Sequence, residues 1–299
     1  MNVRVRVPAT TANLGPGFDC LSLALDLWNE AEFRFEGEGV CMEIHGEGAE
    51  VLSRKPDNLI LTAFYRLLRQ VGAPAPRGLR LCVHNAIPVG SGLGSSASAV
   101  VAGLLAARTW SGVEIPLEQL VELAVSMEGH ADNASAALYG GLTVSVNTSS
   151  GWLVERFEIA PLQVVVVLPQ INLSTRSARL ILPALLEHRD AVFNIGRSVL
   201  VTEALRTGDL DLLGRVMEDR LHQPYRLPLI PGAQDAMRAA REAGAAAVAL
   251  SGAGPSLIAF PNQAPQSVAD AMQAAFRKQG VPSRAFLLRT TLLGAQIQA

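Results

Sequence analysis

The segment PVGSGLGSSASAVVAGLLAA, residues 88–107, constrains the fold more than any other part of the sequence. Its first half alternates glycine with other residues, and its second half is a run of small and apolar side chains. Each glycine adds conformational entropy that the backbone loses on folding. Three alternating glycines are therefore unfavourable for folding unless the loop that they form has a function that requires them. The pattern predicts a loop whose backbone makes a close approach to something, followed directly by a buried helix over residues 95–108.

This loop is predicted to lie between a strand, residues 79–84, and the helix that follows it. Its backbone N–H groups then gather at a helix N-terminus, which is a ready site for an anion. Glycine lets the backbone approach phosphate oxygens, and serine hydroxyls donate to phosphate or ligate Mg²⁺. A nucleoside triphosphate satisfies both features, whereas the alternative is a glycine-rich turn that only packs tightly against its helix.

Two familiar nucleotide-binding motifs do not fit the loop. The Walker pattern needs a lysine after its last glycine, and the only lysines of the chain are Lys55 and Lys278. The dinucleotide pattern needs a glycine where Ser95 stands. The sequence therefore predicts neither a P-loop nor a Rossmann site.

Composition limits the size class and the partners. The chain has 299 residues, which is enough for two domains that each bury a core. Hydrophobic residues make up 49% and charged residues 17%, values typical of globular proteins rather than disordered chains. A net charge of −2, with scattered lysine and arginine, gives no basic footprint for nucleic acid or an anionic membrane. We therefore expect a small-molecule ligand.

The sequence also indicates where the protein works. It contains neither the apolar core of a signal peptide nor a run approaching the ~20 apolar residues of a spanning helix. Its cysteines, Cys20, Cys41 and Cys82, are widely spaced and fit neither a disulfide framework nor a zinc site. We expect a cytoplasmic protein with buried free thiols, and the oligomeric state stays open, a homodimer included.

Strands and helices alternate in the first half of the chain. Valines alternate with arginines in NVRVRVP, which predicts a half-buried strand that ends at Pro8. Helical periodicity covers residues 57–71, with Asp57 as the N-cap, and a second helix is expected over 117–127. Further strands are expected over residues 31–35, 40–45 and 79–84.

The second half begins with a buried strand, QVVVVLP, and helical stretches follow. We expect helices over residues 177–188, 192–207, 210–221, 232–243 and 266–279, and strands over residues 246–250, 256–260 and 283–288. With the QVVVVLP strand, the last part suits a ferredoxin-like domain with helices on one face of an antiparallel sheet. The expected fold class is α+β, with an N-terminal mixed α/β domain over residues 1–158 and a C-terminal domain over 159–299.

Two other segments complete a recognisable set of motifs. PATTANLGPGFD, residues 8–19, is dense in turn formers and ends in a carboxylate, and SGAGPS, residues 251–256, is a tight turn between apolar strands. With the glycine-serine loop, these segments resemble the three motifs of the GHMP small-molecule kinases over nearly the whole chain. The resemblance implies the GHMP kinase fold and ATP-dependent phosphorylation of an alcohol.

Within that superfamily the sequence is similar to the homoserine kinase family. The first motif matches the pattern PAT-(S/T)-ANLG-x-GFD, where mevalonate and galactose kinases have a segment leading to Gly-Glu-His. DNLI, EGHADN, STRSARLILP and PYRLPLIPG also resemble signatures of this family. One departure is ASAALYGG after EGHADN, where the family has a Val-Ala-Pro-like segment. The resemblance implies phosphorylation of the homoserine side-chain hydroxyl, in threonine biosynthesis.

The resemblance also implies an ATP and metal site. Glu128 would hold Mg²⁺ together with a serine of the loop, Ser96 in the first place and Ser95 in reserve. Asn58 resembles an adenine-side residue, and the alternative is that it is part of the Asp57 cap. The residues expected along the nucleotide are Asn58, Pro88, Gly90, Ser91, Gly92, Leu93, Gly94, Ser95, Ser96, Gly252 and Gly254.

The amino-acid substrate would lie beside these groups. Arg179 and Arg226 match the arginines that hold its carboxylate, a role that suits a planar fork of donors. Asn13 and Asp19 match residues near its ammonium and reacting hydroxyl, and the pocket is completed by His130, Asn133 and Thr175. The residues expected to take part in catalysis are Asn13, Asp19, Glu128 and Asn133, with Asp19 and Asn133 orienting the hydroxyl. Asp19 as a general base is the alternative.

Three other functions remain open at this point. One is a GHMP kinase for another alcohol, and the second is a catalytically silent nucleotide-binding sensor. The third is a structural or interaction protein, which predicts no ATP binding. The paired arginines argue against a substrate that lacks a carboxylate, and Ser96 with Glu128 argues against the sensor.

Overall fold

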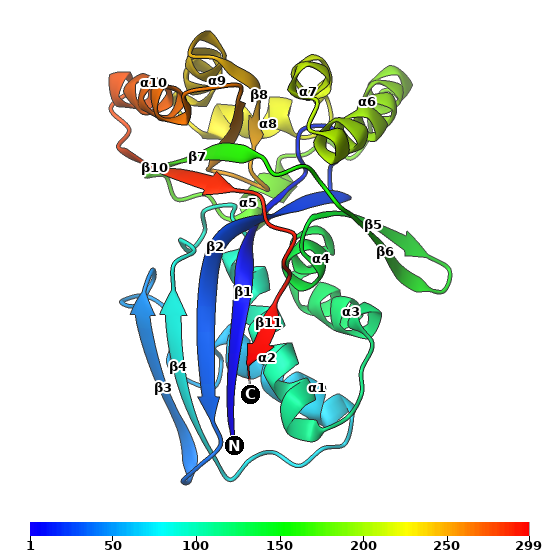
Figure 1. Cartoon of the computed structure of the whole chain (residues 1–299), viewed down its shortest axis with the longest axis vertical. Coiled ribbons are helices and arrows are strands. Elements are labelled where there is room, and N and C mark those ends of the chain that lie inside the picture. The colour runs from blue at the N-terminus through cyan, green and yellow to red at the C-terminus, as the bar shows by residue number, and fades with distance from the viewer. Residues whose placement is uncertain (299) are drawn as a thin grey trace.

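Two β-sheets form the framework of the protein, whose computed structural model describes residues 1–298. One sheet lies in the lower part of Figure 1 and the other in the upper part. The strands of the first sheet are β1 (Asn2–Ala12), β2 (Leu21–Arg34), β3 (Gly39–Gly46), β4 (Gly78–Asn85), β5 (Leu142–Thr148), β6 (Gly151–Phe157) and β11 (Gln296–Gln298). The strands of the second sheet are β7 (Gln163–Pro169), β8 (Ala245–Leu250), β9 (Leu257–Pro261) and β10 (Ser283–Arg289).

Alternation along β1 places its valines in the core of the first sheet. Val3, Val5 and Val7 are fully buried, and the helices of this half pack over them. The strand does not end at Pro8 as expected, because its register with β2 shifts between Pro8 and Ala9 and the pairing then continues. A bulge tolerates a proline that has no N–H to donate, so the strand reaches the first motif.

Four helices belong to the first half of the chain: α1 (Leu59–Gln70), α2 (Ser95–Ser111), α3 (Leu117–Glu128) and α4 (Asp132–Tyr139). The N-cap of α1 is Asn58 rather than the expected Asp57, because the Asn58 side chain accepts a hydrogen bond from the Ile60 N–H at 2.9 Å. The predicted buried helix after the loop is confirmed as α2. A Cβ at Gly103 of α2 would lie 2.2 Å from the Ile60 carbonyl oxygen, so glycine lets α1 and α2 pack closely.

The second sheet has the strand order β10-β7-β9-β8 with every neighbour antiparallel. Helices α9 (Ala233–Glu242) and α10 (Pro265–Lys278) cover one face, and α6 (His188–Thr207) and α7 (Leu210–Val216) cover the other. The expectation of helices on one face is therefore wrong. QVVVVLP explains the difference, because Val164 and Val166 contact the α6 and α7 side while Val165 and Val167 contact the opposite side.

Three short helices complete the fold: α5 (Thr175–Leu180), α8 (Gln223–Arg226) and the 3-10 helix η1 (Leu227–Leu229). The helix expected over residues 177–188 is limited to α5, and Pro183 disfavours helical backbone in the residue before it. The helix expected over 210–221 ends at Val216, five residues early. The backbone beyond it is instead held by the side chain of Asp219, described below.

The chain crosses from the first sheet to the second between Phe157 and Gln163 and later returns, because β11 pairs with β1. The division into residues 1–158 and 159–299 stays a prediction.

Cys20 and Cys41 are exposed and Cys82 is partly exposed, so the thiols are free as expected but not buried. Within residues 1–298, none of the helices has the length and apolar character needed to cross a membrane.

Candidate active site

A cavity of about 280 Å³ opens where the two sheets approach each other. It is bounded by the first motif, the glycine-serine loop, the end of α3, the start of α4, α5, α8 and the SGAGPS turn. Predicted site residues that line it are Asn13, Asp19, Gly90, Ser91, Gly92, Gly94, Ser95, Ser96, Glu128, His130, Asn133, Thr175, Arg179, Arg226, Gly252 and Gly254. Motifs more than 200 residues apart thus meet around one cavity, as between Asn13 and Gly252.

Three predicted residues do not line this cavity. Asn58 is buried at the start of α1, where its side chain also donates to the Ser53 carbonyl oxygen at 2.7 Å. Leu93 belongs to the hydrophobic core, and its carbonyl oxygen accepts from the Thr10 N–H at 3.1 Å. Pro88 lines a neighbouring cleft of about 690 Å³, which shares Gly90 and Asn172 with the cavity.

The glycine-serine loop fits against the SGAGPS turn. The Ser251 hydroxyl donates to the Gly92 carbonyl oxygen at 2.8 Å. Gly92 has a φ of 81°, and a Cβ there would lie 2.3 Å from the Ser251 carbonyl oxygen and 2.9 Å from that of Gly254. A side chain at this position would separate the two segments, so the glycine is required by the contact as well as by the backbone conformation.

The glycine-serine loop places the N-terminus of α2 at the cavity. Gly94 is the N-cap in a left-handed conformation, and no side chain of the described chain caps the helix. Ser95, Ser96 and Ala97 of the first turn line the cavity. Uncapped N–H groups at a helix N-terminus attract a negatively charged group, so this wall of the cavity is suited to phosphate.

Ser96 and Glu128 meet on the same wall. The Ser96 hydroxyl donates to a carboxylate oxygen of Glu128, the last residue of α3, at 2.5 Å. The two residues are 32 positions apart in the sequence. Both present hard oxygen atoms to the cavity, which is the donor type that Mg²⁺ prefers.

The cavity is also lined by a bidentate ion pair. Arg179 donates to the two carboxylate oxygens of Asp19 at 2.8 and 2.7 Å. The hydrogen bond from Arg179 to Asp19 is the main cause that raises the pKa of Arg179, and burial opposes it. Asp19 has a φ of 57°, and its N–H donates to the Asn13 side chain at 2.9 Å. Asn13 in turn donates to the Gly252 carbonyl oxygen at 2.7 Å, so the first motif and the SGAGPS turn hold each other.

Arg226 is buried behind this ion pair and is 1% exposed. Its Nε donates to the Ala178 carbonyl oxygen at 3.0 Å, and one terminal nitrogen lies 3.2 Å from Nδ1 of His222. Burial and, next, the charge of Arg179 lower the pKa of Arg226 to about 10. Within the described chain, no carboxylate lies within 4.0 Å of this guanidinium, although Asp19 and Asp219 raise its pKa from farther away.

His130 and Asn133 are organised by Asp132, which the sequence reasoning missed. His130 Nδ1 lies 2.8 Å from the Asp132 carboxylate, and the Asn133 N–H donates to the same oxygen at 2.7 Å. The Thr10 hydroxyl donates to the Asn133 side-chain oxygen at 2.8 Å. Burial lowers the pKa of His130, but the hydrogen bond and charge of Asp132 outweigh it and the net pKa is raised. Burial likewise raises the pKa of Asp132, but His130 outweighs it and the net pKa is lowered.

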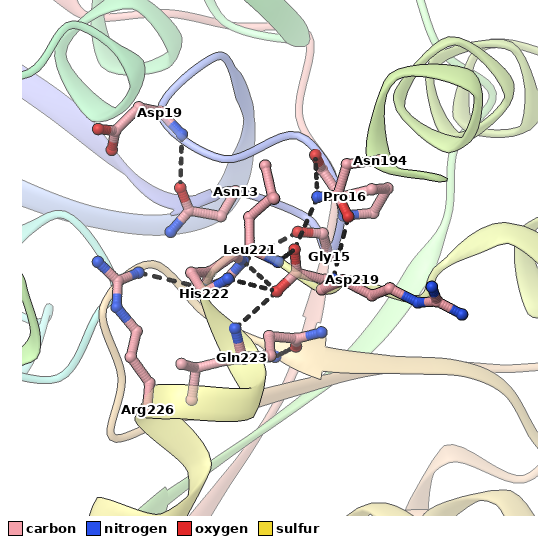
Figure 2. A network of polar contacts seen from close by, with 12 residues as sticks. Asn13, Gly15, Pro16, Asp19, Asn194, Asp219, Leu221, His222, Gln223 and Arg226 are labelled. Carbon is pink, nitrogen blue, oxygen red and sulfur yellow. Dashed lines mark hydrogen bonds and ion pairs between the residues drawn. The ribbon is translucent and has the colours of Figure 1, made fainter. Parts of the chain in front are cut away.

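The sequence reasoning also missed the buried groups behind the cavity, chiefly His222 and Asp219. His222 is fully buried, and its Nε2 lies 2.9 Å from the Gly15 carbonyl oxygen. Figure 2 shows His222 between the first motif and Arg226, with Asp219 beside it. The sequence does contain one signal for His222. It lies four residues before Arg226, at the start of α8, and this spacing could have linked it to the predicted arginine.

Comparisons with known proteins show the family to which the chain belongs. The family models for the GHMP kinases N terminal domain and the GHMP kinases C terminal match residues 58–141 and 201–278. A homoserine kinase of Moorella thermoacetica is 48% identical over 278 residues, which cover 93% of each chain. A homoserine kinase of Prochlorococcus marinus is 46% identical over 300 residues, which cover 98% of this chain and 95% of the relative.

Solved structures give the same result. The crystal structure of homoserine kinase from Cytophaga hutchinsonii matches with a TM-score of 0.87 and 30% identity, covering 99% of this chain and 97% of that chain. A crystal structure of L. major mevalonate kinase matches with a TM-score of 0.72 at 19% identity, which shows the fold alone; it covers 95% of this chain and 94% of that chain. The chain is therefore an ATP-dependent phosphotransferase that belongs to the homoserine kinases of the GHMP kinase family.

Proposed function

We propose that the protein transfers the γ-phosphate of ATP to the side-chain hydroxyl of L-homoserine. The names of the similar proteins support this substrate, and one observation in the cavity carries it. The Arg226 guanidinium is buried and has no carboxylate within 4.0 Å among the described residues. A buried cation needs a partner, and the carboxylate of an amino acid supplies one where a plain alcohol does not.

The substrate amino acid is a zwitterion, and the wall around Arg226 suits both of its ends. Arg179 and Arg226 would bind the carboxylate, since a guanidinium fork matches its geometry. Asp19 would bind the ammonium, and Asn13 supports it through the Asp19 N–H. His130 and Thr175 line the same cavity and would complete the pocket.

The phosphates of ATP are proposed to lie on the glycine-serine loop and the N-terminus of α2. Gly90 is shared by the cavity and the neighbouring cleft, so a nucleotide can extend from one into the other. The cleft is lined by Val89 and Ile171 among other apolar groups, which suits a nucleoside. The adenine-side role of Asn58 stays a prediction, because its side chain serves the α1 cap.

Ser96 and Glu128 fit the proposed Mg²⁺ ligands. Their oxygen atoms meet at the cavity wall, and Mg²⁺ usually takes only one or two carboxylates while keeping several waters. When bound, the metal ion would neutralise charge that develops on the transferring phosphate. Ser95 also lines the cavity and stays the reserve ligand.

Positioning is the main task that remains for the side chains. The transition state of phosphoryl transfer is loose, so in-line placement and charge neutralisation matter more than a strong base. Asn133, held by Thr10 and Asp132, and Asp19 would orient the hydroxyl towards the γ-phosphate. Asp19 is already bound to Arg179 through both carboxylate oxygens, which supports positioning over its alternative role as a general base.

Two further proposals concern the setting of the reaction. Homoserine and ATP are small charged metabolites, so we keep the cytoplasm as the proposed location. A homodimer is the assembly to test by light scattering, although the cavity is formed within one chain and needs no second copy.

A coupled ADP-release assay tests the proposed substrate. The panel is homoserine, mevalonate, galactose and shikimate, each with MgATP. We expect turnover of homoserine with a kcat/KM at least about a hundredfold above the others, because a site built for specific charges rejects analogues that lack them. Turnover of another alcohol at a comparable kcat/KM contradicts the proposal. No turnover at all, with an ATP analogue still binding in calorimetry, favours the nucleotide-binding sensor.

A further inference from the structure

A buried polar network lies behind the residues proposed to bind the substrate, and its inner members, His222 and Asp219, have no part in the function proposed so far (Figure 2). His222 is its centre, fully buried and stacked on the Phe18 ring with centroids 5.2 Å apart. Its Nε2 lies 2.9 Å from the Gly15 carbonyl oxygen, and its Nδ1 lies 3.2 Å from Arg226. One imidazole therefore joins the first motif to the buried arginine.

The two contacts fix the proton of His222. A guanidinium has only donors, so Nδ1 must be unprotonated and accept from Arg226. A carbonyl oxygen only accepts, so Nε2 must carry the hydrogen and donate to Gly15. Only the neutral ring with its proton on Nε2 makes both bonds. Burial lowers the pKa of His222, Arg226 lowers it further, and Asp219 and Asp19 oppose them, so the net direction favours the neutral form.

Asp219 fixes the segment that carries His222. Its carboxylate accepts the N–H groups of Leu221 at 2.8 Å, His222 at 3.0 Å and Gln223 at 2.6 Å. It also accepts from the Asn194 side chain of α6 at 2.7 Å. One of its carboxylate oxygens also lies 3.5 Å from Nε2 of His222, farther than the Gly15 carbonyl oxygen at 2.9 Å. Asp219 thus holds the backbone of His222, while the ring is held by its contacts to Gly15 and Arg226.

The first motif needs such a support. Asn13, Leu14, Gly15 and Asp19 have φ values of 71°, 46°, 72° and 57°. Non-glycine residues in this region carry strain and persist only where the surroundings hold them. Gly15 is the residue that receives the His222 bond, and it lies between the two polar residues that face the substrate.

We propose that His222 is a positioning residue that holds the first motif and the Arg226 guanidinium at a fixed separation. This inference rests on the proposed function, in which the first motif places the ammonium and hydroxyl of the amino acid and Arg226 places its carboxylate. Through its two ring nitrogens, His222 sets the distance between the two ends of the substrate site. It touches neither substrate nor nucleotide itself.

Two conservative variants separate the two contacts. In His222→Asn the amide lies near the position of Nδ1, so it keeps an acceptor for Arg226 and loses the bond to Gly15. In His222→Gln the longer amide reaches the position of Nε2, so it keeps a donor for Gly15 and loses the acceptor for Arg226. We expect His222→Gln to raise the KM for homoserine about tenfold with kcat within about threefold of wild type.

His222→Asn should act in the opposite way. The first motif carries the groups near the reacting hydroxyl, so its displacement should lower kcat about tenfold with a smaller change in KM for homoserine. The KM for ATP should stay within about twofold in both variants. His188→Gln, an exposed histidine at the start of α6, is the matched control and should behave as wild type. Equal losses in kcat and KM in both variants would overturn the division of roles.

A spectroscopic measurement tests the inference without the reaction. Nitrogen-15 NMR of histidine-labelled protein distinguishes the two neutral tautomers from the charged ring. Spectra of variants of the four other histidines assign the His222 signal by elimination, so the assignment does not need a folded His222 variant. We expect His222 to be neutral with its proton on Nε2 at pH 7, because only that form makes both ring contacts. A proton on Nδ1, or a charged ring at pH 7, contradicts the proposal even if both variants fail to fold. Turnover of homoserine by the wild-type protein tests the proposed substrate, and the NMR measurement tests the proposed contacts of His222. Either proposal can therefore be contradicted without the other.

Discussion

Arg179 and Asp19, which both line the cavity, neutralise each other through two hydrogen bonds of 2.8 and 2.7 Å. Both side chains are about one third exposed, so the pair is open to the cavity. A zwitterionic amino acid offers a carboxylate to the arginine and an ammonium to the aspartate. Its binding therefore exchanges one ion pair for two, whereas an analogue with a single charge leaves one partner uncompensated.

Arg179→Ala should weaken binding of homoserine. A hydrogen bond to a charged group contributes roughly 1.5–3 kcal/mol, so we expect kcat/KM to fall about ten- to more than a hundredfold. Most of the loss should appear in the KM for homoserine, because the carboxylate keeps its charge in ground and transition states. Arg176→Ala removes an exposed arginine of the same helix as a control. Steady-state kinetics that give equal KM values for the two variants contradict the assignment.

Gly92→Ala should disturb the nucleotide site through the SGAGPS turn. The added Cβ would meet the Ser251 carbonyl oxygen at 2.3 Å, so the loop must move away. Gly112→Ala is the matched control, since Gly112 has a φ of 67° and a Cβ there meets nothing within 4 Å. Both changes should cost about 1 kcal/mol of stability from backbone strain, and Gly92→Ala should cost more because of its clash with the Ser251 carbonyl oxygen. Only Gly92→Ala should weaken binding of an ATP analogue, by about tenfold or more in calorimetry; equal affinity in both would refute the role of the contact.

Glu128→Gln should lower kcat by about two orders of magnitude or more. The neutral amide is a poorer ligand for Mg²⁺, and a weakly held metal ion neutralises less of the charge that develops on phosphate. The control is Glu122→Gln, an exposed position of the same helix α3. A Mg²⁺ titration of turnover distinguishes the outcomes. Near-normal kcat for Glu128→Gln at saturating Mg²⁺ would mean that this carboxylate does not hold the metal ion.

The His130 and Asp132 pair should make stability depend on pH. The pKa of His130 is raised above its ordinary 6.5, so its stabilisation is complete below about 6.5 and is lost as pH rises through the raised value. The pKa of Asp132 is lowered below its ordinary 3.8, so its stabilisation is present above about 3.8 and is lost as pH falls through the lowered value. Urea unfolding should therefore show the largest cost of Asp132→Asn near pH 5 and a smaller one at pH 9. The same cost at both pH values argues against a charged pair.

Local patterns were sufficient for much of the fold. The valine alternation of β1, the run of small residues in α2 and the glycines of the loop each depend on neighbouring residues alone. The termini of helices were less predictable. α7 ends early because Asp219 binds the backbone beyond it, and that contact has no counterpart in a helical repeat.

Most residues that line the cavity were predicted through their motifs, but Asp132, which also lines it, and His222, which lies behind it, were not. Asp132 lies inside EGHADN, yet its role follows from contacts to both His130 and Asn133 rather than from the spacing. His222 and Gly15 are 207 positions apart, so no local pattern connects them. Long-range contacts of this kind come from packing of the two sheets, which a single sequence does not encode in any short segment.

β11 pairs with β1 at Arg4, Val5 and Arg6, along the outer edge of the first sheet. This pairing joins residues 4–6 to residues 296–298, so the edge is completed by the last part of the described chain to be synthesised. At about 5–20 residues per second, translation leaves that edge of β1 open for roughly 15 to 60 s. An open edge can pair with other strands, so the nascent chain is exposed to mispairing along β1 throughout this interval.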